Sequence, residues 1–433
     1  MPNTFLRQLS ALATTVLTAM TLHAATLIVG PATQSKTKQT MTKDGTGGGG
    51  GPTPASCQSP NYNTIGSAFA AANSGDTIEI CPALYPEQLT ITKPIKLVGL
   101  TYNGFSRVLI QPTTLSPAVS FDGAESAPVE AVISVVNTTN VKIESLAIDA
   151  SNNGISGCTP VVVGIHYYNS SGQINSDAVS GAQVTNCVGA SALKVGNGIG
   201  VLADTDSSGS FAVAIQQSSI HDFTRDGILA IGSGLTATVN GDTVTGHGPG
   251  GGVFQFGVFI ENGAVGLITN NFIHEGGCGN LSGADCLAAR SEGVTVRAVG
   301  DGTVVGGTMI TAAQSGIFIN GGSHVHVYNN VISDIDYLDG IDIQGTAAGA
   351  FTDSIIENNT ITGVLPVANE SGGIWEYSGT GVSGNKLLGN KVNDAYAAIS
   401  AVQADTVAGT SYTNTLYTIL NSDLPTSPPP IEP

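Results

Sequence analysis

Cationic and aromatic side chains are scarce in this sequence of 433 residues. Lys and Arg number 14 against 32 Asp and Glu, which gives a formal net charge of −18. Such a surface repels nucleic acid and anionic lipid, so neither is an expected partner. Only 6% of the residues are aromatic, whereas Val, Ile, Thr, Asn and Gly recur in short runs. This mixture favours many short strands joined by turns over amphipathic helices.

Long apolar segments are missing after the first 25 residues. Those residues carry Arg7, an apolar stretch from Leu9 to Leu22 and the small residues Ala24 and Ala25, a pattern typical of a secretory signal peptide. The stretch is short and rich in hydroxyl groups, which disfavours a membrane anchor. We therefore expect residues 1–25 to be cleaved. The mature chain is predicted to be secreted, periplasmic or on the cell surface, without membrane insertion.

Cysteine is limited to six residues. An even count in an exported chain suggests disulfides, and the coils of a repeat protein contact only their neighbours. We therefore expect nearest-neighbour pairing, which predicts Cys57–Cys81, Cys158–Cys187 and Cys278–Cys286. A zinc site is the alternative, but the sequence lacks a Cys-x-x-Cys pair and a histidine at ligand spacing.

A regular sequence lies between two segments of low complexity. Residues 26–56 are rich in Thr, Lys and Gly and predict a flexible linker, and residues 425–433 predict a proline-rich tail. Residues 57–424 are expected to form one domain. It opens with a short amphipathic helix over residues 62–72. Strand-like alternation follows over residues 76–81, 85–91 and 95–99.

Two short phrases repeat through the rest of this domain. The first is Gly-Ile/Val-x-apolar, which begins at Gly164, Gly198, Gly227, Gly257, Gly293, Gly316, Gly340 and Gly373. The second is Asn-Asn-x-Ile, found at residues 270–273, 329–332 and 358–361. Successive glycines are 23 to 36 residues apart, which predicts coils of three short strands with insertions in the turns. We expect the asparagines to stack from coil to coil and to satisfy the turn backbone.

Residues 62–100 resemble the opening of the pectin-lyase-like superfamily, in which a capping helix precedes GDTI, YPEQLTI and IKLVG. The two repeated phrases are similar to the coils of the same superfamily, and the match covers roughly residues 62–405. The resemblance implies an all-β fold, a right-handed parallel β-helix solenoid with a short N-terminal capping helix. It implies little about chemistry, because this fold hosts lyases, hydrolases, esterases, epimerases and adhesins.

Signatures of particular members of that superfamily are missing. Residues 246–248 (Gly-His-Gly) superficially match polygalacturonases, but the Asn-Thr-Asp, Asp-Asp and Arg-x-Lys segments of those enzymes are absent. The patterns of pectin methylesterases and pectate lyases are absent as well. We therefore interpret residues 246–248 as a glycine-rich turn.

Stacking the glycine phrases predicts one continuous outer wall. The residue after each Gly should point into the core, so the next residue and the one two positions later should point outward. Successive coils lie about 4.8 Å apart, which joins these outward residues into one patch. Exposed aromatic rings beside carboxylates and amides suit sugar rings. The predicted substrate-binding residues are Trp375, Tyr377, Phe318, Asn320, Gln344 and Glu261.

Acidic residues crowd the middle of this outer wall. Asp339 and Asp342 are predicted as an acid/base pair, with Arg297 stabilising the charge that develops on the substrate. A second interpretation is that Asp334, Asp336 and Asp339 hold Ca²⁺, which would offset repulsion of an anionic polymer. The structural alternatives are a solvated acidic turn and an outer wall covered by a long turn or by the tail.

The sequence thus predicts an exported, monomeric, carbohydrate-active protein that binds a polysaccharide along the outer wall. It leaves open whether this protein also cleaves the polysaccharide, as a lyase or a glycoside hydrolase. The alternative is a non-catalytic module of the cell surface with an adhesive or structural role. No cofactor other than Ca²⁺ is indicated.

Overall fold

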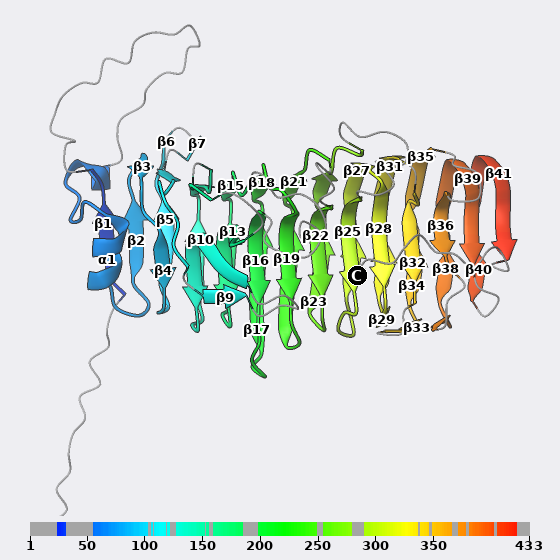
Figure 1. Cartoon of the computed structure of the whole chain (residues 1–433), viewed down its shortest axis with the longest axis horizontal. Coiled ribbons are helices and arrows are strands. Elements are labelled where there is room, and N and C mark those ends of the chain that lie inside the picture. The colour runs from blue at the N-terminus through cyan, green and yellow to red at the C-terminus, as the bar shows by residue number, and fades with distance from the viewer. Residues whose placement is uncertain are drawn as a thin grey trace, which may run out of the picture.

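The computed structural model describes residues 24–31, 55–102, 105–106, 108–117, 119–121, 127–151, 153–155, 159–184, 198–248, 254–278, 290–336, 338–345, 349–365, 371–377, 381–401 and 405–421. These residues form an elongated stack of parallel strands along which the chain advances coil by coil (Figure 1). The predicted all-β fold, a parallel β-helix, is confirmed.

One side of the stack is a parallel sheet of 13 strands. Along it, the strands alternate between core and solvent, as in Lys142, Ile143 and Glu144, of which only Ile143 is buried. Its strands, in order, are β1 (Thr26–Val29), β2 (Thr77–Ile80), β5 (Lys96–Gly99), β11 (Val141–Glu144), β14 (Gly172–Asn175), β17 (Phe211–Gln216), β20 (Leu235–Asn240), β23 (Val265–Thr269), β26 (Val304–Gly306), β30 (His326–Tyr328), β34 (Ile355–Glu357), β38 (Lys386–Leu388) and β40 (Thr406–Ala408).

A second side carries the glycine phrases, and we call it the glycine sheet. It is built from β4 (Leu89–Ile91), β10 (Ala127–Val136), β13 (Val161–Tyr168), β16 (Ile199–Asp204), β19 (Asp226–Ile231), β22 (Gln255–Glu261), β25 (Ser291–Arg297), β28 (Ser315–Asn320), β32 (Ile341–Gln344), β36 (Gly372–Glu376) and the end of β39 (Lys391–Ala401).

The third sheet closes the coil. It contains β3 (Ala83–Tyr85), β8 (Val108–Ile110), β12 (Ala147–Asp149), β15 (Ala178–Ser180), β18 (Ser219–His221), β21 (Thr243–Thr245), β24 (Phe272–His274), β27 (Met309–Ala313), β31 (Val331–Ile335), β35 (Thr360–Val364), the start of β39 and β41 (Ser411–Asn421). Smaller pairings join β6 (Thr101–Tyr102) to β7 (Phe105–Ser106), β9 (Val119–Phe121) to β10, and β29 (Gly322–Ser323), β33 (Phe351–Thr352) and β37 (Val382–Ser383) to one another.

Columns of branched apolar side chains fill the interior. In the glycine sheet one column runs through consecutive strands, and each of its members is fully buried: Ile228, Val258, Val294, Ile317, Ile341, Ile374 and Ile399. Ile341 therefore points inward, as the predicted outer wall requires. Close packing of β-branched residues between parallel strands is what drives this fold.

Each glycine phrase interrupts the ladder at its glycine without changing the register. The ladder pairs Asp226 with Phe256 and Ile228 with Val258, and it leaves Gly227 and the facing Gly257 unpaired. A Cβ at Gly227 would lie 2.4 Å from a methyl carbon of Val244 in the third sheet, so only glycine fits this position. The coil predicted to start at Gly198 is instead in register at Gly200, because Val201 pairs with Ile165 and Ile228. The outward residue of that coil is consequently Leu202 rather than Gly200.

The predicted asparagine ladder is confirmed. The side-chain oxygen of Asn390 accepts hydrogen bonds from the backbone and side-chain N–H groups of Asn359, both at 3.0 Å. The oxygen of Asn359 receives the same two bonds from Asn330. In the preceding coils the position is taken by Thr308, Asn271, Asp242, Ser218 and Asp177.

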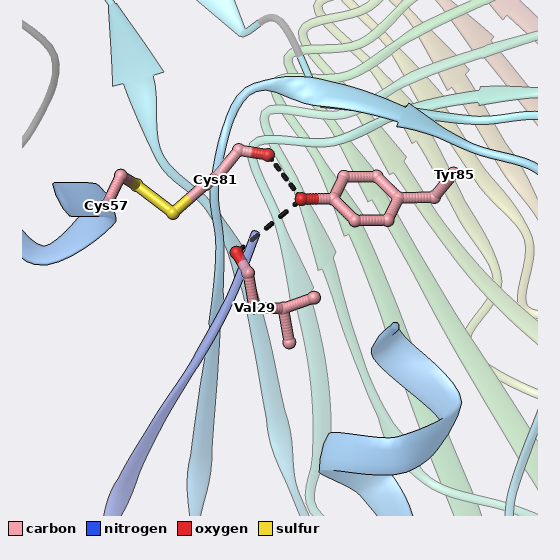
Figure 2. Close-up of a disulfide and its surroundings, with 4 residues drawn as sticks. All are labelled: Val29, Cys57, Cys81 and Tyr85. Carbon is pink, nitrogen blue, oxygen red and sulfur yellow. Dashed lines mark hydrogen bonds between the residues drawn. A yellow bond between two sulfur atoms is a disulfide. The ribbon is translucent and has the colours of Figure 1, made fainter. Parts of the chain in front are cut away.

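The N-terminal end of the solenoid is capped by α1 (Ile65–Ala71), which lies within the helix predicted over residues 62–72. Glu87 accepts hydrogen bonds at 2.8 Å from the backbone N–H groups of Ile65 and Gly66, which satisfies the helix N-terminus. A 3₁₀ turn, η1 (Ala55–Gln58), is tied to the end of β2 by the Cys57–Cys81 disulfide (Figure 2). The Tyr85 hydroxyl donates to the Cys81 carbonyl at 2.7 Å.

The predicted Cys57–Cys81 pair is therefore confirmed. Cys278 is also disulfide-bonded, and its partner lies outside the described residues. Cys158, Cys187 and Cys286 lie outside them too, so the other two predicted pairs stay predictions.

The first strand lies inside the segment predicted as a linker. Residues 26–29 form β1, in which Leu27 and Val29 are buried. This strand is parallel to β2, with Thr26 opposite Thr77 and Val29 opposite Ile80. Four residues that alternate between buried and exposed positions can form a strand at an existing sheet edge. The overall composition of residues 26–56 gave no sign of this strand.

Residues 1–23, 32–54 and 422–433 lie outside the described part, together with most of the predicted signal peptide and the tail. In the described residues, no helix is long and apolar enough to cross a membrane.

Candidate functional site

The glycine sheet brings the predicted wall residues together. Phe318, Asp342 and Trp375 are direct neighbours on β28, β32 and β36. A second outward column joins Glu261, Arg297, Asn320 and Gln344. Tyr377 follows β36, with its ring centroid 6.1 Å from that of Trp375. The spatial grouping of these residues therefore agrees with the sequence analysis.

The outer wall, however, is covered. Phe318 is 5% exposed and Trp375 is 6% exposed, while Asp339 and Asp342 are fully buried. The expectation of exposed aromatic rings is wrong, because Phe318 and Trp375 are buried. The sequence could not predict that this face is buried. Strand alternation tells which side chains point outward, but their exposure also depends on the segments around them.

Asp339 and Asp342 form a buried carboxyl pair. Asp339 accepts a 2.6 Å hydrogen bond from the backbone N–H of Gly372 and another from the Tyr377 hydroxyl. The side-chain amide of Gln344 lies 3.4 Å from Asp342. Burial raises the pKa of Asp339 well above its ordinary value, and the neighbouring Asp342 charge raises that pKa further. Burial also raises the pKa of Asp342 to about 7, although the Arg290 guanidinium opposes this rise.

The cation beside this pair is Arg290 rather than Arg297. The guanidinium of Arg297 binds Glu261, with Nε 3.0 Å from Oε2, and lies 4.9 Å from the Phe259 ring centroid. Arg290 lies 5.7 Å from the Phe318 ring centroid and 3.5 Å from a Glu292 oxygen, and its charge lowers the pKa of both aspartates. Arg290 lies just before β25 and outside the glycine phrase, so the repeat carried no signal for it.

The three residues predicted to hold Ca²⁺ do not share a surface. Asp334 is exposed near the end of β31 with a φ of 57°, Asp336 is half-buried and Asp339 is fully buried. Asp336 instead accepts a hydrogen bond from the backbone N–H of Cys278. Among the described residues, no group of three or more His, Cys, Asp or Glu could hold a metal ion.

Two further buried polar clusters occur on the same side of the molecule. His166 is fully buried, and its Nε2 lies 2.6 Å from an Asp204 oxygen. Glu275 is fully buried as well, and its pKa is raised by burial and by the nearby Asp226 charge. The sequence analysis did not single out either cluster, because each joins residues from different coils.

Residues 197–411 match the family model described as "Right handed beta helix region". This part of the chain is a right-handed β-helix. The right-handed parallel β-helix that the resemblance implied is therefore confirmed as a fold. No curated protein matches the chain in sequence.

Three solved structures illustrate the similarity. The A-module of the mannuronan C-5 epimerase AlgE6 from Azotobacter vinelandii is 17% identical, with 81% of this chain and 93% of that chain covered and a TM-score of 0.45. A family 28 exopolygalacturonase from Yersinia enterocolitica is 11% identical, with 84% and 75% covered and a TM-score of 0.36. The Dettilon tailspike protein is 13% identical, with 81% and 62% covered and a TM-score of 0.42. None is similar enough to transfer a function to this chain.

Proposed function

We propose that this chain is an exported carbohydrate-active protein that binds a polysaccharide at the outer wall and cleaves it with Asp339 and Asp342. The observation that carries the proposal is a pair of carboxyl groups with raised pKa values, flanked by Arg290, Phe318 and Trp375. The Cys57–Cys81 disulfide fits an oxidising compartment outside the cytoplasm. The signal peptide predicted over residues 1–25 would direct the export.

The two carboxyl groups differ in protonation near neutral pH. Burial and the neighbouring Asp342 charge raise the pKa of Asp339 well above its ordinary value, which favours its protonated form and suits a general acid acting on a glycosidic oxygen. Asp342, with a pKa of about 7, is ionised in about half of the molecules and suits a base or nucleophile. This division of roles supports hydrolysis better than elimination, because hydrolysis uses both a proton donor and a carboxylate.

The other predicted residues would bind the sugar. Phe318 and Trp375 offer ring faces on both sides of Asp342, and Tyr377 lies next to Trp375. Asn320, Gln344 and Glu261 supply hydrogen-bonding groups in the adjacent column, where Arg297 holds Glu261 in place. Asp339 and Asp342 are buried, so catalysis would require a local rearrangement that exposes them to the polymer.

A non-catalytic surface module is the second candidate, and the covered wall favours it. In that case Asp339, which accepts hydrogen bonds from Gly372 and Tyr377, would serve to hold neighbouring coils together. Such a protein would bind a polysaccharide or play a structural role at the cell surface without cleaving a substrate.

A panel of polysaccharides separates the two candidates. Release of reducing ends reports hydrolysis, and absorbance of unsaturated uronates reports elimination. Asp342→Asn should lower the turnover at least 100-fold, as expected when a catalytic carboxylate is lost. Asp301→Asn, a matched change at an exposed turn, should leave the turnover unchanged. If no polysaccharide is cleaved, or if Asp342→Asn cleaves as the parent does, the catalytic proposal is wrong.

A further inference from the structure

The third sheet presents a regular outward face that the proposed function does not use. Between its outward residues lie fully buried ones, such as Val244, Ile273, Ile310 and Ile332, so the alternate side chains must face solvent. We call these outward residues the threonine face. Its first column is Ser219, Thr243, Phe272, Met309, Val331, Thr360, Lys391 and Ser411. Its second column is His221, Thr245, His274, Thr311, Ser333, Thr362, Asn393 and Thr413.

The two columns of the threonine face contain no carboxylate, but three exposed aspartates directly follow residues of the second column: Asp222 after β18, Asp334 in β31 and Asp394 in β39. The eight strands of the face succeed one another in register from β18 to β41, over about 34 Å at about 4.8 Å per step. Most of their labels follow one edge of the stack in Figure 1. These aspartates repel an anionic polymer and do not repel a neutral one.

Exposed apolar side chains gather at the centre of this face. Phe272, Met309 and Val331 are 40%, 45% and 43% exposed, and they are direct neighbours on β24, β27 and β31. They make up half of the six exposed large hydrophobic residues in the described part of the chain. Adjacent exposed apolar side chains mark interaction sites more often than isolated ones do.

A row of hydrogen-bonding groups runs beside this apolar strip. His274, Thr311 and Ser333 occupy the same three strands, two residues further along. The Nδ1 atom of His274 lies 3.0 Å from the Thr311 hydroxyl, so these groups already bond along the row. An apolar strip next to hydroxyl and imidazole groups matches a sugar chain, whose CH faces need apolar contact and whose hydroxyls need partners.

We propose that the threonine face binds an uncharged, linear polysaccharide that lies along the solenoid axis. The exposed aspartates beside the second column and the single Lys391 favour a neutral polymer over an anionic one. A second copy of the chain is a poorer occupant, because three part-exposed side chains offer a few hundred Å² against the roughly 800 Å² that each partner buries in a stable interface. This binding does not depend on the carboxyl pair of the outer wall, which lies on another sheet.

Retention on microcrystalline cellulose and on chitin tests the proposal, with soluble polygalacturonate as the anionic comparison. The full chain should be retained by at least one neutral polymer. The triple change Phe272→Thr, Met309→Thr and Val331→Thr should weaken retention at least tenfold. Threonine already occupies this column at Thr243 and Thr360, so the strands should still form. Met309→Thr alone should weaken retention in the same direction if the triple variant does not fold.

The matched control places the same residue on another sheet. Val304→Thr with Ile355→Thr alters outward, half-buried residues of the 13-stranded sheet and should leave retention unchanged. Absence of retention on both neutral polymers, or equal retention of the triple variant and the parent, would overturn the proposal. So would a dimer that the triple variant converts to a monomer in sedimentation. Asp342→Asn should retain normally, so failure of the wall chemistry and failure of this face are distinguishable.

Discussion

Asp242→Asn should stabilise the protein at pH 8 and leave its stability nearly unchanged at pH 4. Asp242 occupies the ladder position that is Asn in the coils of Asn271, Asn330, Asn359 and Asn390. One oxygen of Asp242 accepts the backbone N–H of Ser218 at 2.7 Å. Its other oxygen is buried and makes no further hydrogen bond of good geometry among the described residues, although the backbone N–H of Asn240 lies close enough to lower the pKa of Asp242.

The missing bond follows from a comparison with the next coil. The side-chain N–H of Asn271 donates to the Val239 carbonyl at 3.0 Å. Val239 pairs with Ile215 in the ladder, so the equivalent acceptor for residue 242 is the Ile215 carbonyl. A carboxylate oxygen cannot donate to a carbonyl, whereas a protonated carboxyl or an amide can.

The magnitude follows from the pKa of Asp242, which burial raises from 3.8 to about 7. In the unfolded chain the group ionises near 3.8, so the cost of ionising it in the folded state grows as pH rises from about 4 through about 7. At about 1.4 kcal/mol per pKa unit, the full shift corresponds to about 4 kcal/mol. We expect Asp242→Asn to recover about 2–4 kcal/mol above pH 8 and only about 0.5 kcal/mol near pH 4, where the folded state holds the proton and the unfolded chain has only begun to ionise.

Urea unfolding followed by circular dichroism at pH 4, 6 and 8 measures this difference. The reverse change, Asn271→Asp, is the control and should lose much more stability at pH 8 than at pH 4. A gain that is the same at every pH would show that ionisation is not the cause. A less stable Asp242→Asn variant at pH 8 would refute the ladder argument altogether.

Three further outcomes are expected. The turnover should rise with pH through about 7, as Asp342 ionises while Asp339 keeps its proton, and a rate that is flat with pH would contradict these roles. Gly257→Ala should lower the free energy of unfolding by about 2 kcal/mol or more, since its Cβ would lie 2.6 Å from the Gly293 carbonyl oxygen, and unchanged urea unfolding would contradict this close packing at the glycine. Chelation with EDTA should leave the thermal midpoint unchanged, because Asp334, Asp336 and Asp339 do not converge, and a drop would revive the predicted Ca²⁺ site.

Features that repeat with the coil could be predicted residue by residue. The inward Ile341, the outward Asp342 and the stacked Asn330 and Asn359 follow from strand alternation and from the recurrence of their phrases. Site residues that lie outside the repeated phrases could not be predicted. Arg290, which replaces Arg297 as the cation beside the carboxyl pair, is one of them.

The linker boundary shows a second limit. Composition assigns residues 26–56 to a flexible segment, yet Leu27 and Val29 are buried in a strand. Four residues are too few to change the composition of that segment. Whether they form a strand depends on the free edge of β2, which is a tertiary feature.

By itself the sequence determined the solenoid, because alternating β-branched residues at a coil-length repeat can bury their apolar faces only by stacking on the next coil. It also determined which residues share a column. Only the tertiary structure decided which columns meet solvent, since exposure depends on what lies over a face and not on the residues within it. That is why the outer wall around Asp342 is closed, while the strip of Phe272, Met309 and Val331 on the neighbouring sheet is open.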